Sequence, residues 1–483
     1  MRRVFSCLFT VGLCVVPSRK ARADTLAVGP KGKYPAPCAA FAAAADGDTI
    51  EIDASGAYVG DVCGIAKSKL TIRGIGGLAK IDAGGKNAQG KATWVVQGDD
   101  TTIESVEFTG AAVPDMNGAG IRQEGKNLTV RRCFFHDNEN GILAGDSAGS
   151  EILIENSEFD HNGAGDGFSH NLYINHVAKL TFRYNWSHRA VIGHLLKSRA
   201  AESYVLANRI TGEPDGTASY ELNFPNGGKT YVIGNLIEQG PNTDNPSMLA
   251  YIEEGVNANN PSHQLYVVNN TFVNDKGSGT FLNIAKDAAP AIVTNNVFFG
   301  GGTPSNQATA VLSHNYTETA PCLVDAAAFD YHLVPKAPCV DAGVAPGDGD
   351  GFSLLPDAQY VHPTGNAGRI SVGTIDIGAF ELGGEAAPAG GTNAGGSATG
   401  GIANSGGATG GGEDSAGRSQ AGNATGGSGA VRAGGSGSSH DANSDAGCGC
   451  RVAPAPRSAP YAWLLLAVLL GAVRRRRAMA HGQ

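Results

Sequence analysis

The feature that most limits how this chain can fold is a unit that keeps returning between residues 48 and 299. Each unit has a short β-branched run, a turn, a second run, and then Asn with an aromatic or aliphatic residue. Six asparagines mark it: Asn156, Asn185, Asn208, Asn235, Asn270 and Asn296. They are separated by 29, 23, 27, 35 and 26 residues, and Arg132 takes the same place one unit earlier. Units that contain strands but no helical periodicity cannot bury a face alone, so they must stack on one another.

This stacking predicts an all-β fold, a parallel β-helix that spans residues 24–330. Asn suits the tight turn between strands, because it tolerates the left-handed backbone region and can bond neighbouring backbone groups. The main alternative is an antiparallel sandwich, which would not ordinarily repeat Asn at a fixed phase.

The two ends of the chain differ in composition from the repeats. Residues 1–23 have the pair Arg2-Arg3 near the start, an apolar run from Val4 to Val16 and an A-x-A sequence, which is typical of a secretory signal peptide. After the repeats, residues 331–382 end in GTIDIGAFE, and we expect them to form a closing segment over the open end of the coil. Residues 383–447 are rich in Gly, Ser and Ala and predict a disordered linker.

The last segment, residues 448–483, contains Cys448 and Cys450, a short apolar run from Tyr461 to Val473 and four consecutive arginines. Thirteen apolar residues are fewer than the roughly 20 that a stable bilayer span needs. The basic cluster behind the run should stay cytoplasmic. We therefore expect export, with the folded region held at the cell envelope by this tail or released from it.

Charge excludes nucleic acid as a partner. Eleven of the 36 basic residues lie in the first 23 and last 33 residues, which contain no acid. The chain between them has 25 basic against 45 acidic residues, so it offers no basic surface for phosphates. Outside the cell, cysteines can pair, and Cys38 with Cys63 and Cys322 with Cys339 are two local pairs. Cys133 is left over, and its repeat position indicates a small buried core residue.

The stretch His170 to Ala200 concentrates histidines with a Lys-Ser-Arg triplet. The second strands of the units can be aligned on the first residue of each that faces inward. In four successive units this residue is taken as Leu172, Leu196, Tyr220 and Ala250. Neighbouring strands lie about 4.8 Å apart, and alternate residues face out. One contiguous outward patch is then predicted, made of Tyr173, Asn175, Lys197, Arg199, Glu221, Asn223, Tyr251 and Glu253.

Three resemblances have residues behind them. The repeat region resembles right-handed, single-stranded parallel β-helix proteins, a fold that polysaccharide lyases, epimerases and hydrolases use. GTIDIGAFE resembles the closing motif of secreted β-helix proteins with interchangeable surface anchors. The tail resembles the myxobacterial C-terminal sorting signal, which implies a processing enzyme and display on the surface, with Cys448 or Cys450 as the anchor.

Within the β-helix group, HLLKSRA followed one coil later by SYELNFPNGG is similar in layout to lyases of the chondroitinase B and alginate lyase type. Those have a Lys-Ser on one coil, with Lys as base, and an Arg on the next coil as acid. Lys197-Ser198 matches the first element, whereas Asn223 stands in place of that Arg and Arg199 lies on the strand of Lys197. The acids that those lyases carry before the Lys as calcium ligands are replaced by Gly193-His194.

Eliminating a uronic acid unit needs a group that stabilises the enolate, a base and a proton donor. In the patch, Arg199 with Asn175 or Asn223 could hold the carboxylate, Lys197 or Tyr173 could be the base, and Tyr251 or His176 the donor. His194 would line the patch. An ion pair with Glu221 would raise the pKa of Lys197 and oppose its role as base.

The predicted function is therefore a monomeric cell-surface protein that acts on or binds an acidic, uronic-acid-containing polysaccharide, with β-elimination as the sharper hypothesis. The alternatives are a non-catalytic carbohydrate-binding or adhesive protein and a structural envelope protein, in which the charged residues form a solvated ladder. No cofactor is required by these patterns. Calcium is the one considered, at Glu253 with Glu254 and Glu221.

Overall fold

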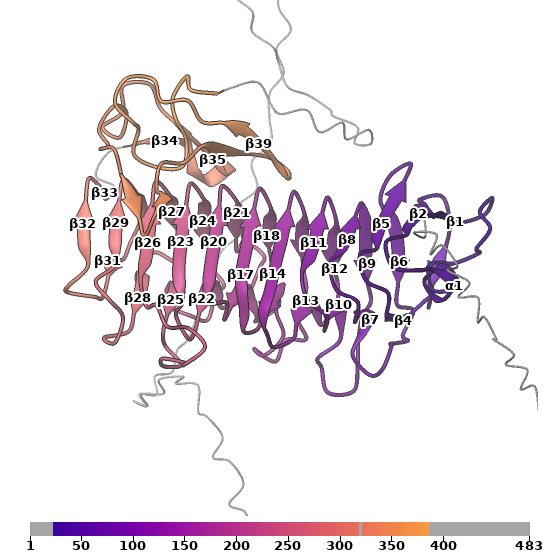
Figure 1. Cartoon of the computed structure of the whole chain (residues 1–483). Coiled ribbons are helices and arrows are strands. Elements are labelled where there is room, and N and C mark those ends of the chain that lie inside the picture. Colours follow the sequence, from indigo (N-terminus) through magenta and orange to yellow (C-terminus); the bar gives the residue numbers. More distant parts are fainter. Residues whose placement is uncertain (1–22, 318–320, 386–483) are drawn as a thin grey trace, which may run out of the picture. The chain divides into compact units, whose positions relative to one another are not determined.

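The computed structural model describes residues 23–317 and 321–385, and its main body is a parallel β-helix of about ten turns (Figure 1). Each full turn contributes one strand to each of three sheets, here called A, B and C in chain order. Strands pair in parallel with the same strand of the next turn, for example β19 with β16 and β22. This confirms the predicted all-β stacking of sequence repeats.

The strands of the three sheets follow one another in chain order. Sheet A contains β1 (Thr25–Val28), β2 (Thr49–Asp53), β5 (Thr71–Ile75), β8 (Thr101–Glu104), β11 (Leu128–Arg131), β14 (Ser147–Glu155), β17 (Val177–Arg183), β20 (Glu202–Leu206), β23 (Lys229–Ile233), β26 (Leu265–Val268), β29 (Ile292–Thr294) and β32 (Val311–Ser313). Sheet B contains β3 (Tyr58–Val59), β6 (Ala79–Asp82), β9 (Val106–Thr109), β12 (Phe134–His136), β15 (Glu158–Asp160), β18 (Trp186–His188), β21 (Arg209–Thr211), β24 (Leu236–Gln239), β27 (Thr271–Asn274), β30 (Val297–Gly300) and β33 (Tyr316–Thr317). Sheet C contains β4 (Cys63–Ile65), β7 (Ala92–Val96), β10 (Ala119–Gln123), β13 (Asn140–Ala144), β16 (Leu172–Ile174), β19 (His194–Ser198), β22 (Tyr220–Phe224), β25 (Ser247–Tyr251), β28 (Thr280–Ile284) and β31 (Thr303–Ser305).

Inside the coil, the repeated asparagines form a hydrogen-bonded ladder between sheets A and B. The backbone N–H and the side-chain amide of Asn208 both donate to Oδ1 of Asn235, each at 2.9 Å. The amide of Asn208 also donates to the carbonyl of Phe182 at 2.9 Å. The contact recurs from Asn185 to Asn315, and the asparagines from Asn185 to Asn296 are fully buried. Because each amide is satisfied, burying it costs little, and each coil is locked to the next.

The expectation that the repeated Asn itself occupies the left-handed turn position was wrong by one residue. The left-handed residue is the one before each ladder position, as at Tyr184 (φ 60°) and Ala207 (φ 47°). Asn156 is itself left-handed (φ 51°), and Ser157 takes the ladder position, with its backbone N–H 2.9 Å from Oδ1 of Asn185. The ladder position selects Asn for its inward hydrogen bonds rather than for its tolerance of positive φ.

A continuous apolar core fills the coil, with aromatic rings stacked from turn to turn. Phe108, Phe135 and Phe159 stack at centroid distances of 5.0 and 4.9 Å. Cys133 is buried, as expected, and burial raises the pKa of its thiol to about 12. At the N-terminal end, helix α1 (Pro37–Ala43) packs on the first turns and is joined to β4 by the disulfide Cys38–Cys63.

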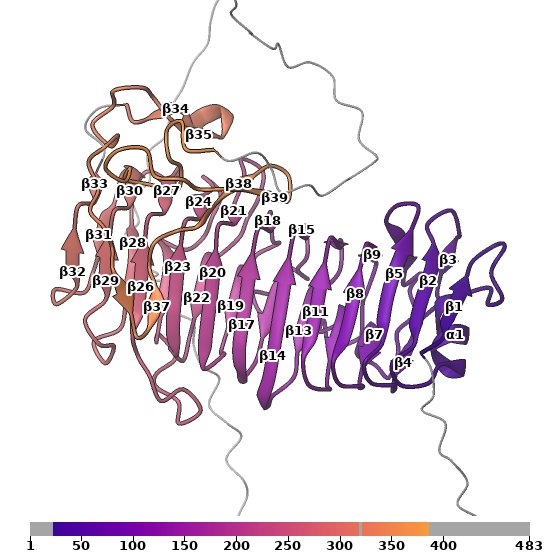
Figure 2. The ribbon, with the colours of Figure 1, turned by 45° about the horizontal axis from the view of Figure 1, so that its top comes forward.

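The closing segment, residues 321–385, lies along the flank of the coil rather than over its open end (Figures 1 and 2). It has three antiparallel hairpins: β34 (Leu323–Asp325) with β35 (Asp330–Leu333), β36 (Asp348–Gly349) with β37 (Phe352–Ser353), and β38 (Ala358–Val361) with β39 (Gly365–Gly368). The short 3-10 helix η1 (Ala326–Ala328) lies within the first hairpin. The coil ends with β33, so the predicted boundary at residue 330 falls inside this hairpin.

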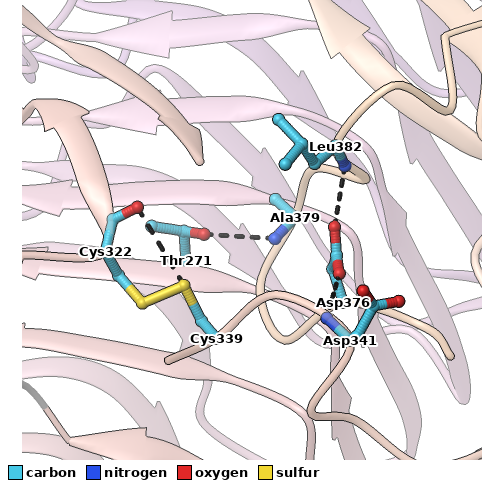
Figure 3. The surroundings of a disulfide bond; sticks show 7 residues. All are labelled: Thr271, Cys322, Cys339, Asp341, Asp376, Ala379 and Leu382. Carbon is cyan, nitrogen blue, oxygen red and sulfur yellow. Dashed lines mark hydrogen bonds between the residues drawn. A yellow bond between two sulfur atoms is a disulfide. The ribbon is translucent and has the colours of Figure 1, made fainter. Parts of the chain in front are cut away.

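The docking of the closing segment explains why it covers the flank. Figure 3 shows the backbone N–H of Ala379 donating to Oγ1 of Thr271 in the coil at 3.1 Å, near the disulfide Cys322–Cys339. The ring of Phe352 packs against Tyr231 at 4.9 Å. Val311, in the last strand of sheet A, stays more than half exposed. The expectation that this segment closes the open end is therefore wrong.

Several predicted regions lie outside the described residues. They are residues 1–22 of the signal peptide, the linker beyond residue 385, and the tail with Cys448 and Cys450. Within residues 23–317 and 321–385, no helix has both the length and the apolar character needed to span a bilayer.

Candidate functional site

The candidate site lies on the outer face of sheet C, where strands β16, β19 and β22 pair. Tyr173 pairs with Lys197, and Lys197 pairs with Asn223, so these three residues are lateral neighbours on successive turns. Side chains from these strands and from two loops meet there. We call this group the Lys197 cluster; it consists of Tyr173, Lys197, Arg199, Asn223, Asn226 and Glu254.

Arg199 is the most connected side chain of the cluster. Its Nε donates to the hydroxyl of Tyr173 at 2.8 Å, and its Nη2 lies 2.6 Å from Oε2 of Glu254. Its Nη1 donates to Oδ1 of Asn226. The guanidinium is thus fixed from three directions, which orients its planar fork for a carboxylate.

Lys197 shares the same carboxylate. Its Nζ lies 3.2 Å from Oε1 of Glu254 and 5.4 Å from the centre of the Tyr173 ring. The side chains of Lys197 and Arg199 are only 12% and 13% exposed, whereas Glu254 is 44% exposed. Two largely buried cations therefore hold one accessible carboxylate between them.

Glu254 reaches this position from the loop of residues 252–264, which joins β25 to β26 and folds back over the three preceding turns. Ile252 begins the loop with φ +65°, an unusual backbone conformation for a β-branched residue. Farther along, Nδ2 of Asn257 lies 3.0 Å from Nε2 of His176. Asn223 donates to Oε1 of Glu253. The loop is thus held by polar contacts with three different turns.

Burial and charge set the ionisation of the cluster. Burial lowers the pKa of Lys197 from its ordinary value, against the opposing effect of Glu254. Although burial opposes it, the two cations hold the pKa of Glu254 below its ordinary value. Burial raises the pKa of the neighbouring Glu253. The two cations therefore favour the charged form of Glu254.

A row of rings borders the cluster at the start of the strands. His170 stacks on His194 at 4.3 Å, and His194 meets Tyr220 edge-on at 5.1 Å. The backbone N–H of His194 donates to Nδ1 of His170 at 3.0 Å, so a neutral His170 carries its proton on Nε2. Burial, aided by Lys197, lowers the pKa of both histidines well below the ordinary value, which keeps the rings neutral.

Two of the predicted patch residues are not on this surface. Leu222, not Tyr220, pairs with Leu196, so the predicted phase was wrong by two residues in β22. Glu221 occupies the corner where Leu195 points into the core, and it is fully buried. The ion-pair partner of Lys197 is Glu254 and not Glu221, and burial raises the pKa of the Glu221 carboxyl well above the ordinary value.

Tyr251 is also inside the coil. Leu249 pairs with Leu222, which turns Ala250 outward and Tyr251 inward. The Tyr251 hydroxyl donates to the carbonyl of Gly228 at 2.6 Å, and burial raises its pKa. It cannot serve as a proton donor at the surface.

The other predicted residues lie around the cluster. Asn175 is half-buried just beyond β16, and His176 contacts Asp146 at 3.4 Å as well as the loop. Among residues 23–317 and 321–385, no three His, Cys, Asp or Glu side chains come together as metal ligands. In particular, Glu221 does not join Glu253 and Glu254, so the three acids considered for calcium do not form one site.

Sequence reasoning missed the central role of Glu254. Its only sequence signal was the pair of adjacent acids before Gly255, directly after a strand of the patch. Asn226 and Asn257 gave no signal, because their contacts depend on how two loops fold back.

Comparisons with known proteins agree with the fold. The model of a family described as the right handed beta helix region matches residues 56–237. Among solved structures, the pectate lyase Pel9A is 16% identical with a TM-score of 0.50, over 71% of this chain and 90% of its own. An alginate lyase from Paenibacillus sp. str. FPU-7 is 16% identical with a TM-score of 0.37, over 61% of this chain and 99% of its own. No curated protein matches the chain. The family match and the likeness to the pectate lyase show that this chain has the right-handed parallel β-helix fold.

Proposed function

We propose that the Lys197 cluster binds the carboxylate of a uronic acid unit in an acidic polysaccharide, and that it cleaves the chain by β-elimination. The observation that carries the proposal is that Lys197 and Arg199 both form ion pairs with Glu254. A carboxylate presented from outside, on a sugar, could take the same place. The likeness of the fold to that of a pectate lyase supports a polysaccharide as the ligand.

The chemistry assigns separate roles to the two cations. Arg199 keeps Tyr173 and Asn226 as partners when Glu254 leaves, so it would hold the sugar carboxylate and stabilise the enolate. Lys197, whose pKa is already lowered by burial, would take the proton from the carbon next to the carboxylate.

The elimination then completes without any outside reagent. The electron pair of the broken C–H bond forms a C=C bond, and the glycosidic C–O bond on the next carbon breaks. The leaving oxygen takes a proton from a donor, for which His176, beside the loop at Asn257, is the candidate. Tyr173 is the alternative base, because its hydroxyl already accepts a hydrogen bond from Arg199.

The ion pairs favour a second candidate function, binding without turnover. While Glu254 stays in contact, Lys197 is held as a protonated partner and not as a base. A protein that keeps this arrangement with ligand bound would be a carbohydrate-binding surface protein.

The test is the ultraviolet absorbance of an unsaturated uronate product, with pectate and with alginate as probes, in calcium and in chelator. We expect a rise that Lys197→Ala abolishes. The matched control is Lys179→Ala, which removes another ion-paired lysine, on sheet A. Binding of either polymer with no rise in absorbance would establish the binding function. Absence of both would refute the proposal.

The proposal also includes export and surface display, with processing at the tail by a sorting enzyme and membrane attachment through Cys448 or Cys450. The disulfides Cys38–Cys63 and Cys322–Cys339 support export, because such bonds persist in oxidising compartments. Calcium, if it acts, would need ligand oxygens from the substrate in addition to Glu253 and Glu254. The calcium and chelator arms of the assay address this point.

A further inference from the structure

Phe168 has the largest exposed fraction, 83%, among the large apolar side chains of the described residues. It lies on the loop of residues 161–171, which leads from sheet B into β16 of sheet C. An aromatic ring left in water forgoes the favourable free energy that its burial would give. A ring in this position calls for an explanation.

The loop holds the Phe168 backbone in place. Oδ1 of Asp166 accepts hydrogen bonds from the backbone N–H of Phe168 at 2.9 Å and of Ser169 at 3.0 Å, and from the Ser169 hydroxyl at 2.8 Å. The Ser169 hydroxyl also accepts from the N–H of Ala164 at 2.6 Å. The exposed ring is therefore presented from an ordered turn.

Phe168 also has an apolar neighbour on the next turn. Ile192, 38% exposed, precedes His194 by two residues, as Phe168 precedes His170. The two loop backbones run close together, because a Cβ built on Gly167 would lie 3.6 Å from the carbonyl oxygen of Ile192. Phe168 and Ile192 form what we call the apolar edge.

The apolar edge continues the Lys197 cluster along the strands. From the edge, the row of His170, His194 and Tyr220 comes next, and then Tyr173 with Lys197. Tyr173 follows Phe168 by five positions, so their Cα atoms are about 17 Å apart at most, as in an extended chain. A polysaccharide with one unit at Lys197 could place another unit, a few sugars along, at the edge.

We propose that Phe168, with Ile192 beside it, is a binding subsite for a sugar ring of the same polysaccharide that the Lys197 cluster engages. The inference rests on the proposed function and adds a second contact to it. The C–H face of a pyranose ring can pack flat on the Phe168 ring, while the sugar hydroxyls stay in water. Such a contact needs no hydrogen-bonding partner, which suits an exposed Phe.

Other occupants fit the apolar edge less well. One Phe and one partly exposed Ile make a patch far smaller than the roughly 800 Å² per partner of a stable interface between two copies. The chain between the two basic ends is strongly acidic, which opposes association between two copies.

The test compares three variants of the full chain: Phe168→Ala, Phe168→Tyr and the control Met116→Ala. Met116 is 51% exposed on the loop before β10, two turns away. The probes are polygalacturonate and its trisaccharide, and the measurements are kcat and KM, or the dissociation constant if no turnover occurs. We expect Phe168→Ala to raise KM for the polymer about 5–10-fold, the usual worth of an aromatic contact.

The same variant should leave kcat unchanged and should raise the trisaccharide KM less than the polymer KM, because a trisaccharide bound at Lys197 has fewer sugar units available for the edge. Phe168→Tyr should restore the polymer KM, because it keeps the ring. Equal values for Phe168→Ala and Met116→Ala would overturn the subsite, as would an equal loss on the trisaccharide. A change of sedimentation coefficient in Phe168→Ala would assign the edge to contact between copies and also overturn it. If the unaltered protein neither binds nor cleaves pectate or alginate, the proposed function itself fails.

Discussion

Replacing Glu254 by Gln should strengthen the binding of acidic polysaccharide. The change keeps the size of the side chain and removes the charge that Lys197 and Arg199 hold at 3.2 and 2.6 Å. A ligand carboxylate must displace Glu254 in the unaltered protein, so the free energy of those contacts is subtracted from the binding free energy.

The magnitude follows from the exposure of Glu254. Its side chain is 44% exposed, so solvent screens both ion pairs, and each is worth roughly 0.5–1 kcal/mol rather than a buried-pair value. Together they oppose ligand binding by about 1–2 kcal/mol, which corresponds to a gain of about 5–30-fold in affinity when they are removed.

Glu254→Gln should also change how activity depends on pH. Glu254 raises the pKa of Lys197, so its removal lowers that pKa further below the ordinary value. If Lys197 is the base, the rising limb of the plot of kcat/KM against pH moves to lower pH.

The assay is isothermal titration with polygalacturonate, followed by a pH profile of product absorbance. The matched control is Glu253→Gln, the same change on the adjacent residue, whose carboxylate takes a hydrogen bond from Asn223 instead of a cation. Weaker binding in Glu254→Gln than in Glu253→Gln would refute the reasoning, because it would mean that Glu254 assists the ligand.

Three further changes test the fold and the site. Asn235→Ala interrupts the ladder and leaves buried groups unpaired, so it should lower the free energy of unfolding in denaturant by about 2–4 kcal/mol, while the exposed Asn242→Ala should stay within about 0.5 kcal/mol. Gly349→Ala places a Cβ 2.5 Å from a ring carbon of Tyr266 in sheet A, which should loosen the contact between the closing segment and the coil. Limited proteolysis should therefore cut the closing segment faster than in Gly149→Ala, where a Cβ meets nothing within 4 Å. Arg199→Lys loses a three-way hydrogen-bonded fork and should weaken polysaccharide binding roughly 10–100-fold in the same titration; an affinity equal to that of the unaltered protein would contradict its role.

The architecture could be predicted because the ladder leaves a strong mark on the sequence. Only a short amide fits a buried position that must both donate to and accept from the next turn, so Asn recurs once per turn. The phase within the turn could not be read as safely. Asn also tolerates positive φ, and Asn156 occupies the left-handed position of the turn for that reason. In the sequence it looks like a ladder residue, but the ladder position is the next residue, Ser157.

The site was predicted in part for a similar reason. Alternation along a strand placed Tyr173, Lys197 and Arg199 correctly, because their strands are regular. It failed at Glu221, because two successive residues point inward at the corner where the strands of sheet C begin, as Leu195 and Leu196 do. A buried carboxyl in that corner breaks the rule that inward residues are apolar, and no pattern reveals it.

The contacts of Lys197 and Arg199 differ in a way that separates their functions. Arg199 is held by Tyr173 and Asn226 as well as by Glu254, so it keeps two hydrogen-bond partners when Glu254 leaves. Lys197 has one ion-pair partner, Glu254, on the loop. When a ligand carboxylate pairs with Arg199 in place of Glu254, Lys197 loses its ion pair with Glu254 and with it the charge that favours its protonated form. Arg199 is suited to hold a carboxylate in every state of the site, whereas Lys197 is the group whose protonation responds to what is bound.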